Sequence, residues 1–220
     1  MVIRIHTQSL GRPQTLSDSK GTWRSAIFRR PVDGPVELGF GGLAGDQVTD
    51  TRYHGDADKA VCCHFLSHYF CWNVEYSLAP ESVLGPGAVG ENWTLDPGTE
   101  EDVFIGDIYQ AGTSRVQVSA PRFPCWKQER KLGLPSFLER TIATMRTGFY
   151  VRVLTPGAVA AGDALILESR PNPQLSVSEV NRSIHRSDDN GLATSLLKTP
   201  ELAESWKRMV VSSRKSAERR

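Results

Sequence analysis

The sequence predicts a mainly β fold with some α-structure, either a barrel or a sandwich, followed by a small helical module. Up to about residue 170 the chain consists of short apolar runs that Gly and Pro interrupt at close intervals, a pattern typical of many short strands joined by turns. A Pro-rich break, RPNPQL at 170–175, follows, and the patterns after it are helical. We therefore expect a β domain over 1–170, a three-helix module over 176–213 and a disordered tail over 214–220.

The predicted strands of the β domain are separated by turn signals such as Gly106-Asp107, Ala111-Gly112 and Gly162-Asp163. They cover residues 1–6, 24–29, 36–38, 103–105, 107–111, 114–119, 149–154 and 164–168. Two helices are predicted among them, one over about 58–76 and one over about 135–144, the second with a proline at its N-terminus.

The helices of the module are predicted from their start signals. Ser176 and Glu179 have capping-box spacing and open the first helix, while Thr199-Pro200-Glu201 supplies a cap, an N-terminal proline and a first-turn acid for the last. GLATSLLK, 191–198, can form a short helix between them. A module of this length needs the β domain to pack against.

Composition excludes several classes of partner. The chain has 220 residues, 39% of them hydrophobic and 23% charged, which is ordinary for a globular protein with a core. Lys and Arg number 26 against 25 Asp and Glu, so no overall positive field favours nucleic acid or a membrane surface. The N-terminus resembles a first strand and not a secretion signal, and no apolar run could span a membrane, so we expect a cytoplasmic protein. The four cysteines lack the spacing of a disulfide framework, which indicates reduced thiols.

Cys125 is the first candidate for chemistry. It lies in PRFPCWK, 121–127, where two prolines favour a stiff extended loop. The cations Arg122 and Lys127 favour its thiolate, the form that acts as a nucleophile or metal ligand. The alternative is a buried cysteine that packs beside Phe123 and Trp126.

The densest group of ionisable residues is GLAGDQVTDTRYHGDADKAV, 42–61. Asp58 could cap the helix expected from Lys59 onward, and the amides of its first turn would then form an anion site that a glycine-containing loop lets a phosphate approach. A solvated loop is the alternative.

Other patterns leave two interpretations each. His64, His68 and Cys71 would share one helix face, which suggests zinc, but the surrounding aromatic residues favour simple packing. Asn92, in GENWT, could hydrogen-bond a ligand or form an Asx-turn. Cys125 could also pair with His54 as nucleophile and base, although the sequence cannot place them together. No GxSxG, P-loop or GxGxxG motif is present.

Four motifs in order give the chain a family resemblance. They are GDQVTD-x-x-x-HGDADKAV (45–61), GENWT (90–94), FIGD (104–107) and QVSAPRFPCWK (117–127). Together they resemble the MOSC domain, and within it the YiiM-like branch linked to resistance against N-hydroxylated purines such as 6-hydroxylaminopurine. The resemblance covers roughly residues 1–168, and the three-helix module resembles the one that accompanies this branch. Asp56 stands where many relatives have glycine.

The resemblance implies a MOSC-type β-barrel that binds a molybdenum cofactor (molybdopterin), with Cys125 as thiolate ligand to the metal. It implies catalytic roles for Cys125 and His54, the latter as proton donor. The implied cofactor-binding residues are Asp46, Arg52, Lys59, Asn92, Arg122 and Lys127. The residues agree independently, because a soft thiolate suits a transition metal and cations balance an anionic cofactor.

The expected function is reduction of N-hydroxylated bases to amines. The sequence has no flavin, nicotinamide or iron–sulfur motif, so a separate electron-donating reductase is expected beside the small-molecule substrate. The alternative is a carrier or sulfur-transfer module that binds the molybdenum cofactor without substrate turnover, with Cys125 as a persulfide or docking thiol.

Overall fold

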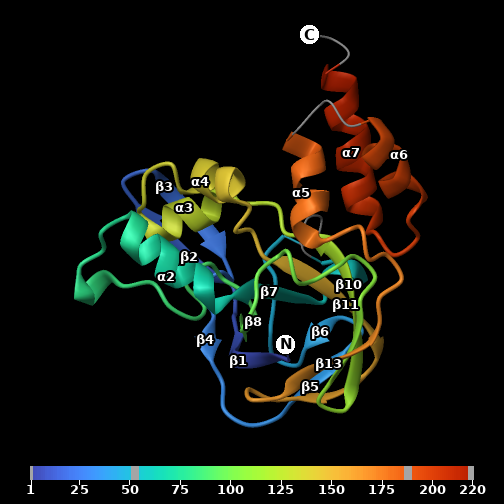
Figure 1. The fold of residues 1–220 in the computed structure, drawn as a ribbon. Coiled ribbons are helices and arrows are strands. Elements are labelled where there is room, and N and C mark those ends of the chain that lie inside the picture. Colours follow the sequence, from blue (N-terminus) through green and yellow to red (C-terminus); the bar gives the residue numbers. More distant parts are fainter. Residues whose placement is uncertain (1, 51–54, 186–189, 218–220) are drawn as a thin grey trace.

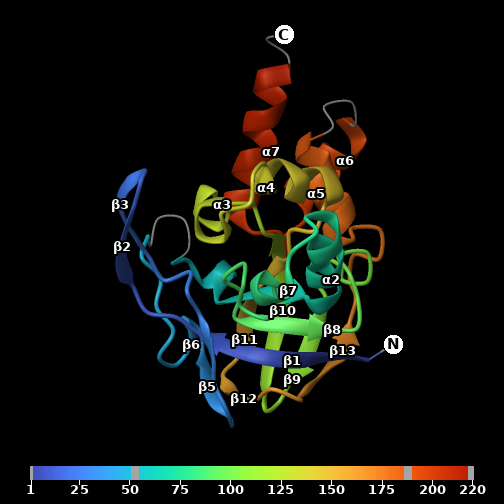
Figure 2. The ribbon, with the colours of Figure 1, turned by 90° about the vertical axis from the view of Figure 1, so that its left-hand side faces the viewer.

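A closed barrel of seven strands forms the centre of the molecule (Figures 1 and 2). The computed structural model describes residues 2–50, 55–185 and 190–217. The strands pair in the order β13-β9-β10-β11-β7-β8-β1, and β1 pairs again with β13, which closes the ring. They are β1 (Ile3–Leu10), β7 (Val61–Phe65), β8 (Trp93–Asp96), β9 (Ile108–Ala111), β10 (Ser114–Pro121), β11 (Phe149–Thr155) and β13 (Ala164–Ser169). All neighbours are antiparallel except β7 and β8, so the predicted mainly β fold with a barrel is confirmed.

Shorter strands surround the barrel. They are β2 (Gln14–Asp18) with β3 (Gly21–Ser25) as a hairpin, β4 (Arg30–Pro31) on β1, and β5 (Val36–Gly39), β6 (Gly42–Leu43) and β12 (Gly157–Val159) as a small sheet. The predicted strand 24–29 is wrong beyond Ser25, since the chain there turns away to line a cavity. The predicted strand 103–105 is reduced to one bridge between Phe104 and Ser176.

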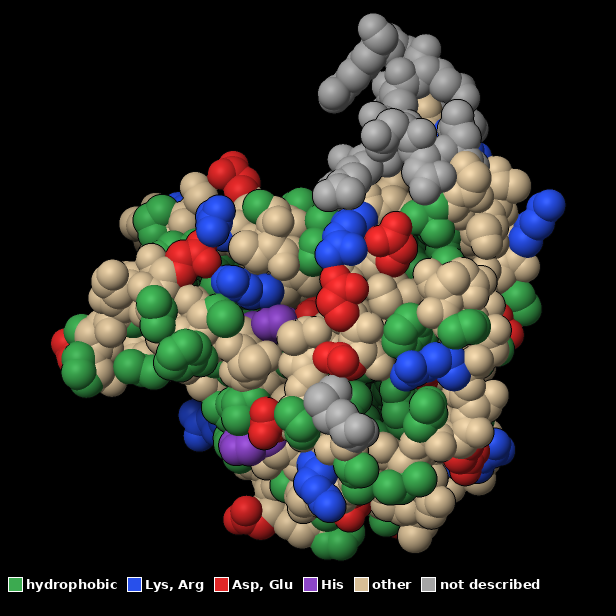
Figure 3. Space-filling view, viewed as in Figure 1, with side chains coloured by type: hydrophobic (Ala, Val, Ile, Leu, Met, Phe, Trp, Pro, Cys, Tyr) green, Lys and Arg blue, Asp and Glu red, His purple; other side chains and the backbone are tan. Residues whose placement is uncertain are grey.

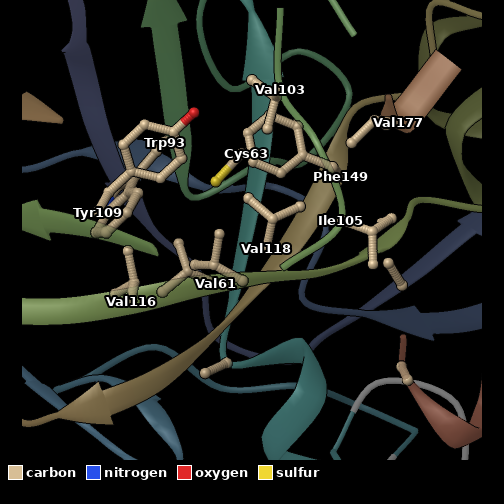
Figure 4. Close-up of a cluster of buried hydrophobic side chains, with 14 of the residues drawn as sticks. Val61, Cys63, Trp93, Val103, Ile105, Tyr109, Val116, Val118, Phe149 and Val177 are labelled. Carbon is tan, nitrogen blue, oxygen red and sulfur yellow. The ribbon is translucent and has the colours of Figure 1, made fainter. Parts of the chain in front are cut away.

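The barrel interior is filled by apolar side chains from nearly every strand. Figure 4 shows Val61, Cys63, Trp93, Val116 and Phe149 converging there, all of them fully buried. Val116 and Val118 alternate with the less buried Arg115 and Gln117 along β10, the pattern of a strand with one face in a core. This packed interior fixes the barrel wall from which the site loops leave.

The helix predicted over 58–76 is wrong in its first half. Residues Val61–Phe65 form β7, every residue of which is buried, and α2 covers only Leu66–Glu75. A strand buried on both faces reads as a continuous apolar run, which the period of its hydrophobic residues cannot distinguish from a buried helix. Consequently His64 lies on a strand while His68 and Cys71 lie on a helix, and the three do not share a helix face.

The helices form two groups on the barrel (Figures 1 and 2). Besides α2, the first group has α3 (Trp126–Leu132) and α4 (Phe137–Thr144), with Ser136 before α4 where the sequence placed the start at Pro135. The second group is α5 (Val177–His185), α6 (Asn190–Lys198) and α7 (Glu204–Ala217). Two single-turn 3-10 helices, η1 (Ala57–Lys59) and η2 (Pro80–Ser82), lie in connections.

The C-terminal helices share the hydrophobic core of the barrel. Val177, Val180, Leu196 and Trp206 are buried in the same cluster as the barrel residues, which meets the expected need of the module for a packing partner. The Ser176 hydroxyl accepts the Glu179 N–H at 3.1 Å, so this half of the predicted capping box is present. α7 begins at 204, not at 201, and runs to residue 217, through the first part of the segment predicted to be disordered.

Charges of both signs are interspersed on the face shown in Figure 3. Several charged side chains of the chain form ion pairs, such as Arg182 with Glu101 at 2.6 Å and Arg115 with Glu168 at 2.8 Å. Exposed pairs of this kind contribute little to stability. None of the helices in the described ranges has both the length and the apolar character needed to cross a membrane.

Candidate functional site

A cavity of about 240 Å³ lies where loops from distant parts of the chain meet. Six of the residues that the sequence predicted for the site line it, namely Asp46, Lys59, Asn92, Arg122, Cys125 and Lys127. The other two, Arg52 and His54, lie outside the described residues. The described residues on either side of that segment, Asp50 and Gly55, line the cavity. The structure therefore brings together six residues that span 82 positions of the sequence, from 46 to 127.

Cys125 is held in place at the start of α3. Its N–H donates to Oε1 of Gln128 at 3.0 Å, and the Gln128 N–H donates back to the Cys125 carbonyl at 2.9 Å. The cysteine is half-buried, whereas Phe123 and Trp126 are 43% and 50% exposed. Cys125 is therefore not packed in a core with these aromatic residues, and its backbone has little freedom to turn the thiol away from the cavity.

Arg122 places a buried cation in the cavity wall. Its Nη2 donates to the Val89 carbonyl at 2.7 Å, while Nη1 is buried and has no hydrogen-bond partner among the described residues. Burial opposes the charge, but Cys62, Tyr150 and Glu91 nearby act the other way, and the pKa of Arg122 is raised overall. The guanidinium therefore stays charged and keeps one donor group available.

Glu91 is the buried counterpart of this positive charge. Its Oε1 accepts hydrogen bonds from the Tyr69 hydroxyl at 2.6 Å, the Gly87 N–H at 2.7 Å and the Thr94 hydroxyl at 2.7 Å. Burial and the adjacent carboxylate raise the pKa of Tyr69 well above its ordinary value, so Tyr69 remains a donor. Glu91 thus fixes the 87–91 turn behind the cavity, a role that GENWT gave no means of assigning.

Asp46 is bonded by the protein itself. Its carboxylate accepts hydrogen bonds from Nε and Nη2 of Arg29 at 3.1 and 2.7 Å and from the Gly11 N–H at 2.7 Å. Arg29 in turn donates Nη1 to the Gly90 carbonyl at 2.6 Å. Arg29 also lines the cavity, but the sequence gives no signal for this, because FRRP, 28–31, has no spacing that relates it to Asp46.

Asn92 joins three strands at the back of the cavity. Its Oδ1 accepts the Cys62 N–H at 3.1 Å and its Nδ2 donates to the Ser9 carbonyl at 3.2 Å. These bonds differ from both a free ligand-binding amide and an Asx-turn. Cys62 and Tyr150 lie in the same wall, and burial raises the pKa of both groups. Both are therefore neutral at pH 7, which leaves the charge of this wall to Arg122.

Two lysines, Lys59 and Lys127, add positive charge to the cavity lining. Lys59 Nζ lies 3.0 Å from Asp56 Oδ2, and Lys127 Nζ lies 5.8 Å from the centre of the Trp126 ring. The anion site predicted at a helix N-terminus near Lys59 is wrong, because η1 is a single turn. Asp58 does not cap it and pairs with Arg152 at 2.8 Å.

The buried histidines belong to the core. His68 Nε2 lies 2.6 Å from Glu100 Oε2, and the His64 ring stacks on Trp72 with centroids 5.2 Å apart. Burial lowers the pKa of His64 well below its ordinary value. The part of the chain that the structure describes contains no group of three or more His, Cys, Asp or Glu side chains that could hold a metal ion, so the packing interpretation of these histidines is the one the structure supports.

We predict that the stability of the protein depends on pH through Lys131. Its Nζ donates to the carbonyls of Ile27 and Gly87 at 3.1 and 2.8 Å, and burial lowers its pKa from 10.5 to about 8. Below pH 8 the Lys131 ammonium group is protonated in both the folded and the unfolded chain, so Lys131 does not make the free energy of unfolding depend on pH there. From about pH 8 toward 10.5 only the unfolded chain retains this proton, so the free energy of unfolding rises with pH, by up to about 3 kcal/mol in all.

Urea unfolding at pH 7.5, 8.5 and 9.5 measures this effect. We expect Lys131→Met to lack the rise between pH 8 and 9.5 that the unsubstituted protein shows. Equal slopes for the two proteins would contradict the lowered pKa.

Both the sequence and the fold of this chain have relatives among known proteins. Residues 50–166 match the MOSC domain family. The uncharacterized protein YflK of Bacillus subtilis (strain 168) is 38% identical over 200 residues, 90% of this chain and 89% of YflK. A protein of Gibberella moniliformis named "Reductase" is 38% identical over 165 residues, which are 74% of this chain but only 29% of that protein. The crystal structure of YiiM from Geobacillus stearothermophilus superposes with a TM-score of 0.80 at 33% identity, covering 96% of this chain and 99% of that one. With its barrel, its C-terminal helices and the shared residues 50–166, the chain belongs to the MOSC domain family and is a homologue of the YiiM proteins.

Proposed function

We propose that this protein is a molybdenum-cofactor-dependent oxidoreductase that reduces N-hydroxylated bases, such as 6-hydroxylaminopurine, to the amine. The reaction R–NH–OH + 2 e⁻ + 2 H⁺ → R–NH₂ + H₂O balances in atoms and charge. The observation that carries the proposal is the position of Cys125, a half-buried thiol that lines one cavity with four cations, Arg29, Lys59, Arg122 and Lys127. The association of MOSC domains with the molybdenum cofactor supports it.

The residues of the cavity fit such a cofactor. Sγ of Cys125 would hold the metal, since soft thiolates suit transition metals of this kind. Arg122 would bind the anionic part of the cofactor with its unpartnered Nη1, and Lys59 and Lys127 would add positive charge. Asn92 and Asp46 would act through the backbone segments that they fix. When bound, the cofactor would supply the two-electron chemistry that takes oxygen from the substrate.

The chain supplies orientation, charge and protons. The bonds between Cys125 and Gln128 fix the backbone that carries the thiol, and the guanidinium of Arg122 holds positive charge where burial weakens screening by solvent. His54 is our proposed proton donor, because an ordinary histidine pKa allows both protonation states near pH 7. Arg52 is proposed to contact the cofactor from the same segment.

A separate electron donor belongs to this proposal. The chain matches less than a third of the Gibberella protein named "Reductase", so in that protein the matched domain is joined to a much longer polypeptide. We propose that this chain receives two electrons from a partner protein. In such a longer relative, the additional part of the polypeptide could provide these electrons.

The test is metal content followed by turnover. The protein is purified from a host that makes the molybdenum cofactor, its molybdenum is measured per chain, and reduction of 6-hydroxylaminopurine is followed with reduced methyl viologen as donor. We expect about one molybdenum per chain and formation of adenine. Molybdenum at that ratio without turnover of several N-hydroxylated substrates would support the carrier alternative instead, and protein without molybdenum would contradict both.

A further inference from the structure

A second concave surface shares Arg29 with the cavity. It consists of two adjoining hollows of about 440 and 340 Å³, which share Gln14, Phe28 and Arg30. Its walls come from 10–14, 28–32 and 83–88, with Lys131 reaching in from α3. We call this surface the basic groove.

The groove carries charge of one sign. Arg12, Arg29, Arg30 and Lys131 line it, and none of the described residues that line it is acidic. This separation is local, because the whole chain has a formal net charge of only +1. A cleft lined by one sign of charge concentrates its field and attracts partners of the opposite sign.

The four cations divide into two kinds. Arg29 and Lys131 already donate to protein acceptors, Asp46 and Gly90 for the first and Ile27 and Gly87 for the second. Arg12 and Arg30 are exposed, and the side chains of both have no hydrogen bond or ion pair with the described residues. A small anion would need several buried donors that converge on it. Two exposed guanidinium groups above an open hollow suit the acidic surface of a protein better.

Arg29 connects the groove to the cavity. Its side chain lines both, and its bonds to Asp46 and Gly90 hold it between them. A partner seated in the groove would therefore be one side chain, that of Arg29, away from the cavity that Cys125 lines.

We propose that the basic groove docks the acidic face of a small flavin or iron–sulfur electron-transfer protein. The inference rests on the proposed function, since reduction of one N-hydroxyl group consumes two electrons and the sequence contains no flavin, nicotinamide or iron–sulfur motif. The partner supplies these two electrons, in one step or in two, and water is the other product besides the amine.

The experiment reverses the two exposed charges. The double variant Arg12→Glu/Arg30→Glu is compared with Lys198→Glu/Arg208→Glu, which makes the same change in net charge on α6 and α7, helices that lie away from β4 in Figure 1. Reduced flavodoxin, an acidic protein, and reduced methyl viologen, a small cation, serve as alternative donors for 6-hydroxylaminopurine reduction. At low ionic strength we expect the groove variant to lose at least about tenfold in kcat/KM for flavodoxin and nothing with methyl viologen. The control should keep both rates, and added salt should reduce the difference between the variants.

The outcomes separate the groove from the reaction. A groove variant that keeps its flavodoxin rate, or a control that loses as much, overturns the docking site. If the unsubstituted protein turns over with neither donor, the proposed function fails, and calorimetric titration with flavodoxin then decides about the groove independently. Binding that the groove variant loses and the control keeps supports the docking site, and absence of binding to the unsubstituted protein overturns it.

Discussion

Cys125→Ser is expected to abolish molybdenum retention and the reduction of 6-hydroxylaminopurine while it leaves the fold intact. A serine oxygen is a harder and much weaker ligand than a thiolate. Loss of a supporting contact alone costs metal sites 10- to 100-fold in affinity, so loss of the ligand should cost more than about a hundredfold. The thiol is half-buried at the N-cap of α3, a position that serine favours, so the free energy of unfolding of the metal-free protein should change by less than about 0.5 kcal/mol.

Cys71→Ser is the matched control. Cys71 is also a half-buried free cysteine, but it lies on α2 and does not line the cavity. Elemental analysis of both variants, each purified from a cofactor-producing host, gives the molybdenum per chain, and urea unfolding gives the stability. Full molybdenum content in Cys125→Ser would show that this sulfur is not the ligand, and equal loss in both variants would point to a general effect of thiol removal.

The sequence predicted the members of the site better than their tasks. The family resemblance assigned Cys125, Arg122 and Asn92 to one site, and all three line one cavity of the structure. The partners of these residues are far away along the chain. The Asn92 amide bonds Cys62 and Ser9, and the Arg122 guanidinium bonds Val89. Such pairings arise only when the barrel closes, and no spacing in a single sequence encodes them.

The errors in secondary structure have two different causes. The sequence predicts helix at β7 because the burial of this strand on both faces comes from the closed barrel, which is tertiary information. α3, by contrast, left a readable signal. Glu129 lies in its first turn, Arg130 and Lys131 lie in its last, and Gly133 ends it in a left-handed conformation with φ of 66°. The two prolines of PRFPCWK obscured this signal, although they stiffen only the chain before Cys125.

Asp46 shows most directly how a residue can be placed in a site and yet have another task. The sequence assigned it to cofactor binding, but its carboxylate oxygens are bonded to Arg29 and to the Gly11 N–H, and both charged side chains of the pair are only 10% exposed. Asp46→Asn should therefore destabilise the metal-free protein by about 3 kcal/mol or more, because it leaves the Arg29 charge buried without its partner.

The control for this prediction is Asp56→Asn. Asp56 also lines the cavity, but its side chain is 43% exposed and pairs with Lys59, so its loss should cost less than about 1 kcal/mol. Urea unfolding of the metal-free variants measures the difference between them. If Asp46→Asn instead kept full stability and lost only molybdenum, direct contact with the cofactor would be its main task. If the free energy of unfolding of metal-free Asp46→Asn falls as expected, then the main task of Asp46 is to maintain the shape of the cavity. The bonds from Arg29 to Asp46 and Gly90 connect the segments that line it.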